Sequence, residues 1–428
     1  MTTSIIPSTL PARERCKPRA IDRFARRILF SLLERLEHGR LNLVDGRERH
    51  FFGRTSAAFP LEATLTVLHQ RFYGDCLFGG TIGAGEAYMS GFWSADDLAT
   101  VIRIFALHPQ VFSGMDQGIA RAMAPAYKYL HALNRNTRRG SRRNIIAHYD
   151  LGNEFYRLFL DDTLTYSCGI FERPDSSLRE ASIAKYDRIC RKLELSPADR
   201  VIEIGTGWGG FALHAAANYG CRVTTTTISD RQYELAGQRI AAAGLTDRIT
   251  LWKRDYRDMG GRFDKLVSIE MIEAVGHHFL DDFFRVCSDC LKPEGQMLLQ
   301  AITIRDQVFE WHKDNVDFIK RYIFPGSCIP SLAAISGAVA RATDLRLFHL
   351  EDITPHYVRT LRKWRQSFLA NLEHVRALGF SEAFIRMWEF YLCYCEGGFA
   401  ERYLGDVQIL FTKPMCRRDP ILPVLPRQ

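Results

Sequence analysis

The sequence predicts an α/β protein whose larger part is a mostly parallel sheet, together with a smaller N-terminal domain of mixed α+β class. Two observations carry this prediction. From residue 177 onward, helical segments alternate with short β-branched runs, and a glycine-rich turn follows the first of these runs. Alternation of this kind is typical of parallel strands covered by helices on both faces. The seven expected strands lie at 200–205, 221–228, 249–254, 264–270, 295–303, 345–350 and 407–413.

Between and before these strands, apolar spacing indicates helices. We expect them at 177–193 and 330–342, and through the aromatic-rich stretch 354–403. Near the N-terminus, apolar residues recur at helical spacing over 21–36, with four arginines off the stripe. This helix can pack against its own domain or lie on a membrane surface. A further helix is expected over 95–107, with Ser94 as its N-cap.

Composition bounds the architecture and the class of protein. The chain has 428 residues, 46% of them apolar and 25% charged, which is ordinary for a globular protein of two domains. We divide it into an N-terminal accessory, lipid-interacting domain at 1–125, a basic linker at 126–147, a catalytic domain at 148–413 and a flexible tail at 414–428 with four prolines. No apolar run approaches 18 residues, and no signal peptide is visible.

Charge and cysteine usage favour a cytoplasmic protein that meets an anionic surface. The formal net charge is +8, and basic residues concentrate before residue 50 and again at 135–143. Such patches suit lipid headgroups or nucleic acid, or they are simply solvated faces. Eleven scattered cysteines fit reduced thiols better than a disulfide framework. Neither Cys287-x-x-Cys290 nor Cys393-x-Cys395 has a second pair at zinc spacing, so no metal site is expected.

The glycine-rich turn predicts a nucleotide-like cofactor. An apolar strand at 201–204 leads into Gly205, Gly207, Gly209 and Gly210, and a helix follows. Glycines at this junction let the backbone approach a ligand closely, and the helix start offers free N–H groups. An NAD site would need an acidic residue at the end of the second strand, but 224–227 is a run of four threonines. Glu203 completes the pattern E-x-G-x-G-x-G, which favours S-adenosylmethionine (SAM).

Several motifs, in order along the chain, resemble those of cyclopropane-fatty-acyl-phospholipid synthases and mycolic acid cyclopropane synthases. The resemblance runs over about residues 145–413. Its segments are HYDLGNEFYRLFLDDTLTYSCGIFE (148–172), EIGTGWGG (203–210), TISDRQ (227–232), VSIEMIEAVG (267–276), RYIFPGSCIPS (321–331) and YLCYCEGGF (391–399), with GEAYMSGFW (85–93) before them. It implies a class I SAM-dependent methyltransferase fold, Rossmann-like, with a seven-stranded sheet.

The resemblance also implies a chemistry. The double bond of an unsaturated acyl chain attacks the SAM methyl group, and a base removes a proton from the transferred carbon so that a ring closes. In the family that base is bicarbonate, and the matching positions are Cys168, Glu273, Ile302 and Tyr357. Where the family usually has a histidine, this chain has Gln300, which makes bicarbonate dependence and ring closure less secure. Two milder departures are Thr206, where cysteine is common, and Glu270, where glycine is frequent.

Further site residues follow from the same resemblance. Tyr322 and Tyr357 are expected to face the cation, because aromatic faces favour positive charge. Cys395 matches a cysteine long suspected of catalysis in the family, but we interpret it as pocket lining, since the reaction needs no thiol. Contacts to SAM are expected from ten residues: Tyr166, Ser167, Glu203, Gly205, Gly207, Gly209, Thr227, Gln232, Asp255 and Tyr256.

The expected partners are phospholipids with unsaturated chains at the inner face of the membrane, to which the protein would bind peripherally. A homodimer is left open. Three alternatives remain: methyl or methylene branching of the same chains, favoured by Gln300; a lipid- or SAM-binding protein without catalysis; and a nucleic-acid methyltransferase. The last rests only on the basic linker and has no base-flipping motif, so no nucleic acid is expected.

Overall fold

The computed structural model describes residues 19–108, 136 and 151–422, and these form two compact units. Of the described residues, unit 1 contains 19–108, 314–325 and 361–403, and unit 2 contains 136, 151–313, 326–360 and 404–422. The division therefore differs from the one that we expected along the sequence. Two segments of the predicted catalytic domain cluster with the N-terminal residues, and the predicted linker 126–147 lies outside the described residues except for Asn136.

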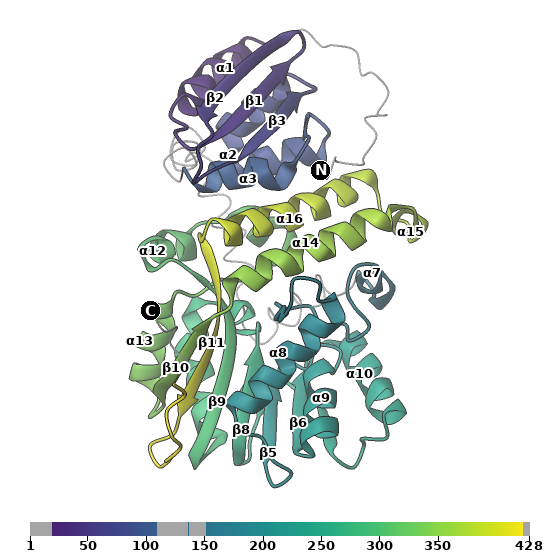
Figure 1. The fold of residues 1–428 in the computed structure, drawn as a ribbon, viewed down its shortest axis with the longest axis vertical. Helices are drawn as coiled ribbons and strands as arrows, with labels where there is room; N and C mark the ends of the chain where they lie inside the picture. Colours follow the sequence, from purple (N-terminus) through teal and green to yellow (C-terminus); the bar gives the residue numbers. More distant parts are fainter. Residues whose placement is uncertain (1–18, 109–135, 137–150, 423–428) are drawn as a thin grey trace. The chain divides into compact units, whose positions relative to one another are not determined.

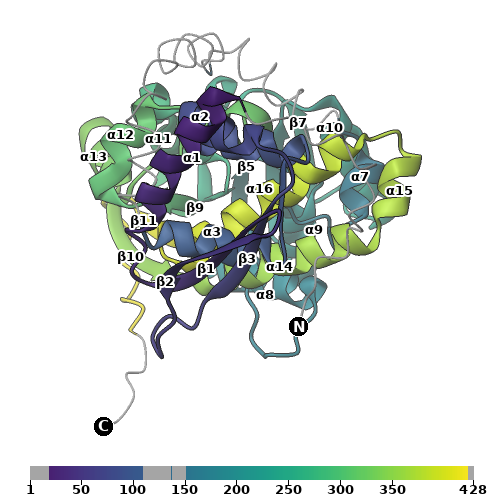
Figure 2. The same cartoon turned by 90° about the horizontal axis from the view of Figure 1, so that it is seen from above.

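Unit 1 is built on a four-stranded sheet of order β2-β1-β3-β4. The β1–β2 and β3–β4 pairs are antiparallel, and the β1–β3 pair is parallel. Helices α1 and α2 pack against each other (Figure 2). The elements of this unit are α1 (Ala20–Leu33), β1 (Gly39–Asp45), β2 (Glu48–Arg54), β3 (Glu62–Val67), α2 (Arg71–Met89), β4 (Trp93–Ala95), α3 (Leu98–Ala106), a π-helical turn (Ile319–Ile323), α15 (Leu372–Ala377) and α16 (Glu382–Ala400).

The start of helix α3 corrects one prediction. Ser94 does not cap this helix, because it lies in β4, where it pairs with Thr66 of β3. The N-cap is Asp97, whose side chain accepts a hydrogen bond from the Thr100 backbone N–H at 3.2 Å. Both residues are good caps by type, so only the pairing of the short strand decides between them.

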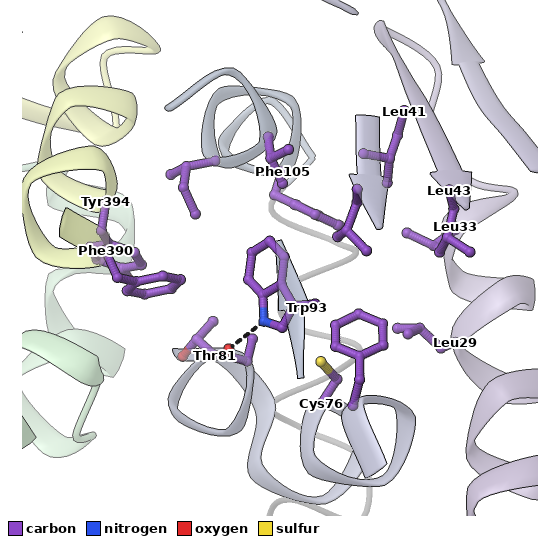
Figure 3. Close-up of a pocket in the computed structure, with 15 residues that line it drawn as sticks. Leu29, Leu33, Leu41, Leu43, Cys76, Thr81, Trp93, Phe105, Phe390 and Tyr394 are labelled. Atoms are coloured by element: carbon purple, nitrogen blue, oxygen red, sulfur yellow. Dashed lines mark hydrogen bonds between the residues drawn. The ribbon is translucent and has the colours of Figure 1, made fainter. Parts of the chain in front are cut away.

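An apolar pocket of about 50 Å³ lies in the core of unit 1. Trp93 stands at its centre, with leucines from α1 and the sheet on one side and Phe390 and Tyr394 of α16 on another (Figure 3). The indole N–H of Trp93 donates to the Ala84 carbonyl at 2.9 Å, so the ring is fixed in place. Helix α2 passes the pocket with a kink at Gly80, whose φ of 56° favours glycine.

Unit 2 carries a seven-stranded sheet of order β10-β11-β9-β8-β5-β6-β7 (Figure 1). Strands β5 to β9 run parallel, and β11 is antiparallel to both of its neighbours, β9 and β10. The elements are α7 (Asn153–Arg157), α8 (Leu178–Lys192), β5 (Arg200–Ile204), α9 (Gly210–Tyr219), β6 (Arg222–Thr227), α10 (Asp230–Ala242), β7 (Ile249–Lys253), β8 (Phe263–Ile269), α11 (Leu280–Asp289), β9 (Leu291–Ile304), α12 (Asp306–Asp314), α13 (Leu332–Ala342), β10 (Arg346–Asp352), α14 (Thr354–Ala370) and β11 (Leu404–Thr412), of which α12 and α14 extend into unit 1.

The sheet confirms the predicted α/β class and all seven predicted strands. Alternate residues of the strands enter two separate cores. One core joins Ile202 and Leu266 to helices α11 and α13, and the other joins Val201 and Val267 to helices α8, α9 and α10. Because both faces are buried, most central residues of the strands are apolar, and the polar exceptions, such as Glu203 and Thr225, hydrogen-bond to each other. Among the described residues, no helix is both long and apolar enough to cross a bilayer.

Candidate active site

The candidate site lies at the carboxyl ends of the parallel strands of unit 2, where open α/β sheets bind ligands. Two groups of residues meet there. The first follows β5 and β6 and contains the glycine loop. The second follows β8 and draws on β9, β11 and α14. They adjoin each other, because a Cβ added at Gly205 would lie 3.2 Å from the Met271 side chain, one residue after Glu270.

The glycine loop has the backbone that only glycine adopts easily. Gly205, Gly207 and Gly209 have φ values of 95°, 54° and 89°. A Cβ at Gly207 would meet no atom within 4 Å, so the loop borders open space at this point. At Gly210, where α9 begins, a Cβ would meet the Tyr186 hydroxyl at 2.3 Å. The loop thus packs against α8 on one side and borders open space on the other. It can receive the nucleoside of SAM close to the α9 N-terminus.

Beneath the loop, Glu203 is part of a buried hydrogen-bonded group with two threonines. The Thr225 hydroxyl donates to Glu203 at 2.5 Å and lies 2.5 Å from the Thr206 hydroxyl. Burial raises the pKa of Glu203 to about 8, so its carboxyl is protonated near neutral pH. At the end of β6, the Thr227 hydroxyl donates to Gln232 at 2.9 Å. These side chains fix the loop from below, and their contacts to SAM stay predictions.

The other residues expected at the cofactor lie around the same edge. Ser167 accepts a hydrogen bond from the Lys185 ammonium at 2.7 Å, and the Tyr166 ring packs edge-on to Tyr156. After β7, Asp255 accepts two hydrogen bonds from the Arg257 guanidinium. Tyr256 follows Asp255 in a short 3₁₀ turn and packs against Phe283. Their expected roles at SAM also stay predictions.

Glu270 is the centre of the second group. Its carboxylate accepts three hydrogen bonds: from the Cys168 backbone N–H at 2.8 Å, from Gln300 Nε2 at 2.8 Å and from the Tyr357 hydroxyl at 2.6 Å. The φ of Glu270 is 46°, a conformation that side-chain-bearing residues rarely adopt. Three donors from separate parts of the chain thus hold this one carboxylate in place.

Two more carboxyl groups border Glu270. Glu273 Oε1 accepts from the Ile302 backbone N–H at 2.6 Å, while its Oε2 is buried without a hydrogen-bond partner. Burial and the charge of Glu270 raise the pKa of Glu273 to about 8. Asp406, opposite Ile302 in the β9–β11 pairing, is fully buried and lies 3.3 Å from Gln300 Nε2. Burial, then the charges of Glu270 and Glu273, raise the pKa of Asp406 strongly.

The structure therefore brings five of the seven predicted catalytic residues together: Cys168, Glu273, Gln300, Ile302 and Tyr357. The other two belong to unit 1. Tyr322 donates its hydroxyl to Glu86 at 2.5 Å, and Cys395 lies on α16 with a thiol whose pKa is raised by burial. A raised thiol pKa disfavours the nucleophilic thiolate. The roles of Tyr322 at the cation and of Cys395 in the pocket lining stay predictions.

Sequence reasoning missed three polar residues of this site as participants. The sequence marks Glu270 only as a departure from a frequent glycine, and the family motifs do not include Asp406 or Lys185. Lys185 had a usable signal, since it lies on the buried stripe of α8 between Ala181 and Ile189. Within the described part of the chain, no three His, Cys, Asp or Glu side chains are grouped so as to hold a metal ion.

Comparison with known proteins adds relatives in both sequence and structure. Residues 136–409 match the mycolic acid cyclopropane synthetase family. The chain is 38% identical over 336 residues to a tuberculostearic acid methyltransferase of Mycobacterium tuberculosis, covering 77% of this chain and 78% of the relative. It is 34% identical to the cyclopropane-fatty-acyl-phospholipid synthase of Escherichia coli K12, covering 82% and 88%. Among solved structures, mycolic acid cyclopropane synthase CmaA1 complexed with SAH and CTAB superimposes with a TM-score of 0.60 at 31% identity, covering 64% of this chain and 98% of CmaA1.

Proposed function

The chain belongs to the mycolic acid cyclopropane synthetase family, and we propose that it modifies the double bonds of unsaturated acyl chains in membrane phospholipids, forming cyclopropanes. It is a SAM-dependent methyltransferase with the class I fold. Relatives named as cyclopropane synthases support the reaction type, and the relative from Escherichia coli is named for phospholipid substrates. The substrate class of this chain rests on that likeness.

One observation carries the chemistry: a carboxylate with three donors stands directly beside the glycine loop. When bound, SAM supplies an electrophilic methyl group. The π electrons of the alkene would form the new carbon–carbon bond, and the electrons of the broken carbon–sulfur bond would stay with the departing sulfur. Glu270 can then accept a proton from the added carbon, and the freed electron pair closes the ring. Tyr357 and Gln300 orient the carboxylate for this step.

Glu270 also bears on the expected bicarbonate. The resemblance assigns the base to a bicarbonate ion held at Cys168, Glu273, Ile302 and Tyr357, with Gln300 in place of a histidine. In this chain, the donors at Cys168, Gln300 and Tyr357 point to Glu270, and Ile302 donates to Glu273. Because these donors bind the chain's own carboxylates, we propose that Glu270 takes the role of the ion.

A second candidate product is a methylene branch without a ring, or a methyl branch after reduction by a partner. Ring closure and methylene formation both remove a proton from the added carbon and add the same atoms. Methylene formation first needs a 1,2-hydride shift that moves the cation to the carbon bearing the new methyl group, and Glu270 can accept the proton in either reaction. Two relatives are named as methyltransferases rather than cyclopropane synthases, one for tuberculostearic acid and one as a probable fatty acid methyltransferase. Gln300, in place of the family's usual histidine, also favours this alternative.

We further propose that unit 1 meets the lipid. On α1, Phe24 and Ile21 are 53% and 46% exposed, and the exposed arginines Arg23 and Arg27 lie beside them. An apolar wedge with flanking basic residues suits the surface of an anionic bilayer. Binding would be peripheral and at the cytoplasmic face.

The test of the function is incubation with SAM and vesicles of a defined monounsaturated phospholipid. We expect the acyl chains to gain one CH₂ in mass, and gas chromatography then separates a ring from a methylene branch. Absence of any mass gain across several unsaturated phospholipids would overturn the proposal. For the base, Glu270→Gly with and without added bicarbonate is informative. Glycine suits the φ of this position, and recovery of activity by bicarbonate alone in the variant would support replacement of the ion by Glu270.

A further inference from the structure

Two buried glutamines lie side by side in the sheet of unit 2 and lead to the proposed base. Gln408 of β11 pairs directly with Gln300 of β9, and Glu351 of β10 pairs with Gln408 on its other side. Directly opposed residues point to the same face of a sheet, here the face covered by α8. Both glutamine side chains are fully buried. Since burying an amide is costly unless it is hydrogen-bonded, the partners of this pair need to be identified.

The two glutamines, here called the amide row, connect Lys192 to Glu270 by three hydrogen bonds. Lys192, the last residue of α8, donates from Nζ to Gln408 Oε1 at 2.8 Å. Gln408 Nε2 donates to Gln300 Oε1 at 3.0 Å, and Gln300 Nε2 donates to Glu270 Oε1 at 2.8 Å. Each link is a direct contact between side chains, and all four residues belong to unit 2.

The direction of the amide row is fixed at the end where Lys192 lies. An ammonium has three donors and no acceptor, whereas an amide accepts at its oxygen and donates at its nitrogen. The Gln408 oxygen therefore faces Lys192, and its nitrogen faces Gln300. The Gln300 nitrogen is then left to face Glu270. The ion pair of Lys192 with Glu351 at 2.6 Å supplies the negative charge that a buried ammonium requires.

A reversed Gln300 amide would lose its contact with the base. Its oxygen would face the backbone carbonyl of Cys168, which lies 3.5 Å from Nε2, and Glu270 Oε1, which already accepts from the Cys168 N–H at 2.8 Å. Three acceptors would then meet without a donor, which is costly in a buried place. We propose that Lys192 is a positioning residue that sets the direction of the amide row and thereby keeps the Gln300 donor on Glu270. This inference rests on the proposed function, in which Gln300 orients the base.

Reversing the amide row tests the inference. In Gln408→Glu, the carboxylate still accepts from Lys192 but has no N–H for Gln300, so the Gln300 amide has to turn. On vesicles of dioleoyl phosphatidylglycerol, we expect kcat to fall about tenfold or more while KM for SAM stays within about twofold. Gln408→Met is the matched variant, because it has a similar shape and interrupts the row without reversing it. Glu270 then still holds the Gln300 donor, and kcat should fall only about threefold.

Lys192 is tested directly by a second set of variants, which add no buried charge. Lys192→Met should lower kcat about threefold, and Lys192→Arg, which keeps a donor, should recover most of the loss. Glu351 keeps a partner in both variants, because Arg188 Nε donates to it at 2.7 Å. The control is Glu351→Gln, which removes the ion pair but leaves the donor of Lys192 in place, and its kcat should stay within about twofold.

In the background of Gln300→Leu, Gln408→Glu should lower kcat no further, because the amide that it would turn is absent. Equal kcat values for Gln408→Glu and Gln408→Met, a loss that persists in the Gln300→Leu background, or an undiminished kcat for Lys192→Met would overturn the inference. If Gln408→Glu does not fold, as judged by loss of SAM binding, Lys192→Met and Lys192→Arg decide. Absence of product from the wild type would instead overturn the proposed function.

Discussion

The two groups of residues at the carboxyl edge of the sheet differ in how they are assembled. The glycine-loop group, Glu203 to Thr227, comes from one strand–turn–helix–strand segment, and its polar side chains hydrogen-bond mainly to one another. The second group, the Glu270 cluster, draws its residues from five segments between Cys168 and Asp406. The first holds a single carboxyl group among threonine hydroxyls, and the second brings three carboxyl groups close together, those of Glu270, Glu273 and Asp406.

This difference teaches where the chemistry resides. A neutral scaffold holds a ligand by shape and backbone N–H groups and changes little with pH. Buried charges can exchange protons, and their behaviour depends on every neighbour. We therefore expect substitutions in the Glu270 cluster to change the rate of turnover, and substitutions in the glycine-loop group to change the affinity for SAM.

The largest effect is expected for Glu270→Gln. The amide is close in shape but cannot accept the proton, so product formation should fall by about 10²- to 10⁴-fold. Binding of SAM, measured by titration calorimetry, should stay within about twofold. A variant that loses affinity for SAM as strongly as it loses rate would remove the distinction between the two groups.

Tyr357→Phe tests the same carboxylate more gently. The substitution deletes one hydrogen bond to a charged group, which is worth about 1.5–3 kcal/mol, so the rate should fall about ten- to hundredfold. Tyr219→Phe serves as the control, since Tyr219 is the last residue of α9, at the opposite end of the helix from the glycine loop, and its hydroxyl donates to Asp187 on α8. Equal rates for Tyr357→Phe and the wild type would count against Glu270 as the base.

Gly205→Ala addresses the glycine-loop group. The φ of 95° strains any side-chain-bearing residue, and the new Cβ would press on Met271 at 3.2 Å. We expect the dissociation constant for SAM to rise about tenfold or more, for a backbone cost of about 1–2 kcal/mol. Gly244→Ala, with φ of 67° in an exposed turn without close neighbours, should lose some stability but keep its affinity for SAM.

The smallest effect is expected for an ion pair that is connected to the Glu270 cluster through a chain of hydrogen bonds. Lys192 donates to Gln408, which donates to Gln300, and it also pairs with Glu351 at 2.6 Å. Burial raises the pKa of Glu351, but hydrogen bonds from Arg188 and Lys192 outweigh it and lower the pKa to about 2. Glu351 therefore stabilises the fold above its unfolded pKa of about 4.5, and this contribution is lost as pH falls toward 2.

Glu351→Gln should remove that contribution. Urea unfolding at pH 7 and pH 3 should show a smaller loss of stability on acidification for the variant than for the wild type. Turnover at pH 7 should change far less than with Tyr357→Phe. A variant whose stability depends on pH just as the wild type does would show that the ion pair contributes nothing measurable.

The sequence predicted the fold well because its signals are local. The strands and the glycine loop are continuous segments with clear apolar runs and turn residues. The Ser94 cap failed because strand pairing with Thr66, a non-local contact, determines the conformation there. The place of Glu270 could not be predicted, since its three donors are separated from it by 30 to 102 residues. The one indication in the sequence that Glu270 belongs to the site is that it replaces a glycine frequent in the family.

The composition of unit 1 has a consequence for protein engineering. Helix α16 belongs to the family-matched region, yet within unit 1 it is joined to the N-terminal residues by buried contacts. Tyr88 donates to the buried Glu389 at 2.8 Å, and a Cβ at Gly397 would lie 2.6 Å from Ile102. Excising the first 125 residues, or grafting them onto a shorter relative, would uncover this helix and leave a buried acid without its hydroxyl partner. A transplantable module has to include α16, although some 280 positions of chain separate it from the rest of its own core.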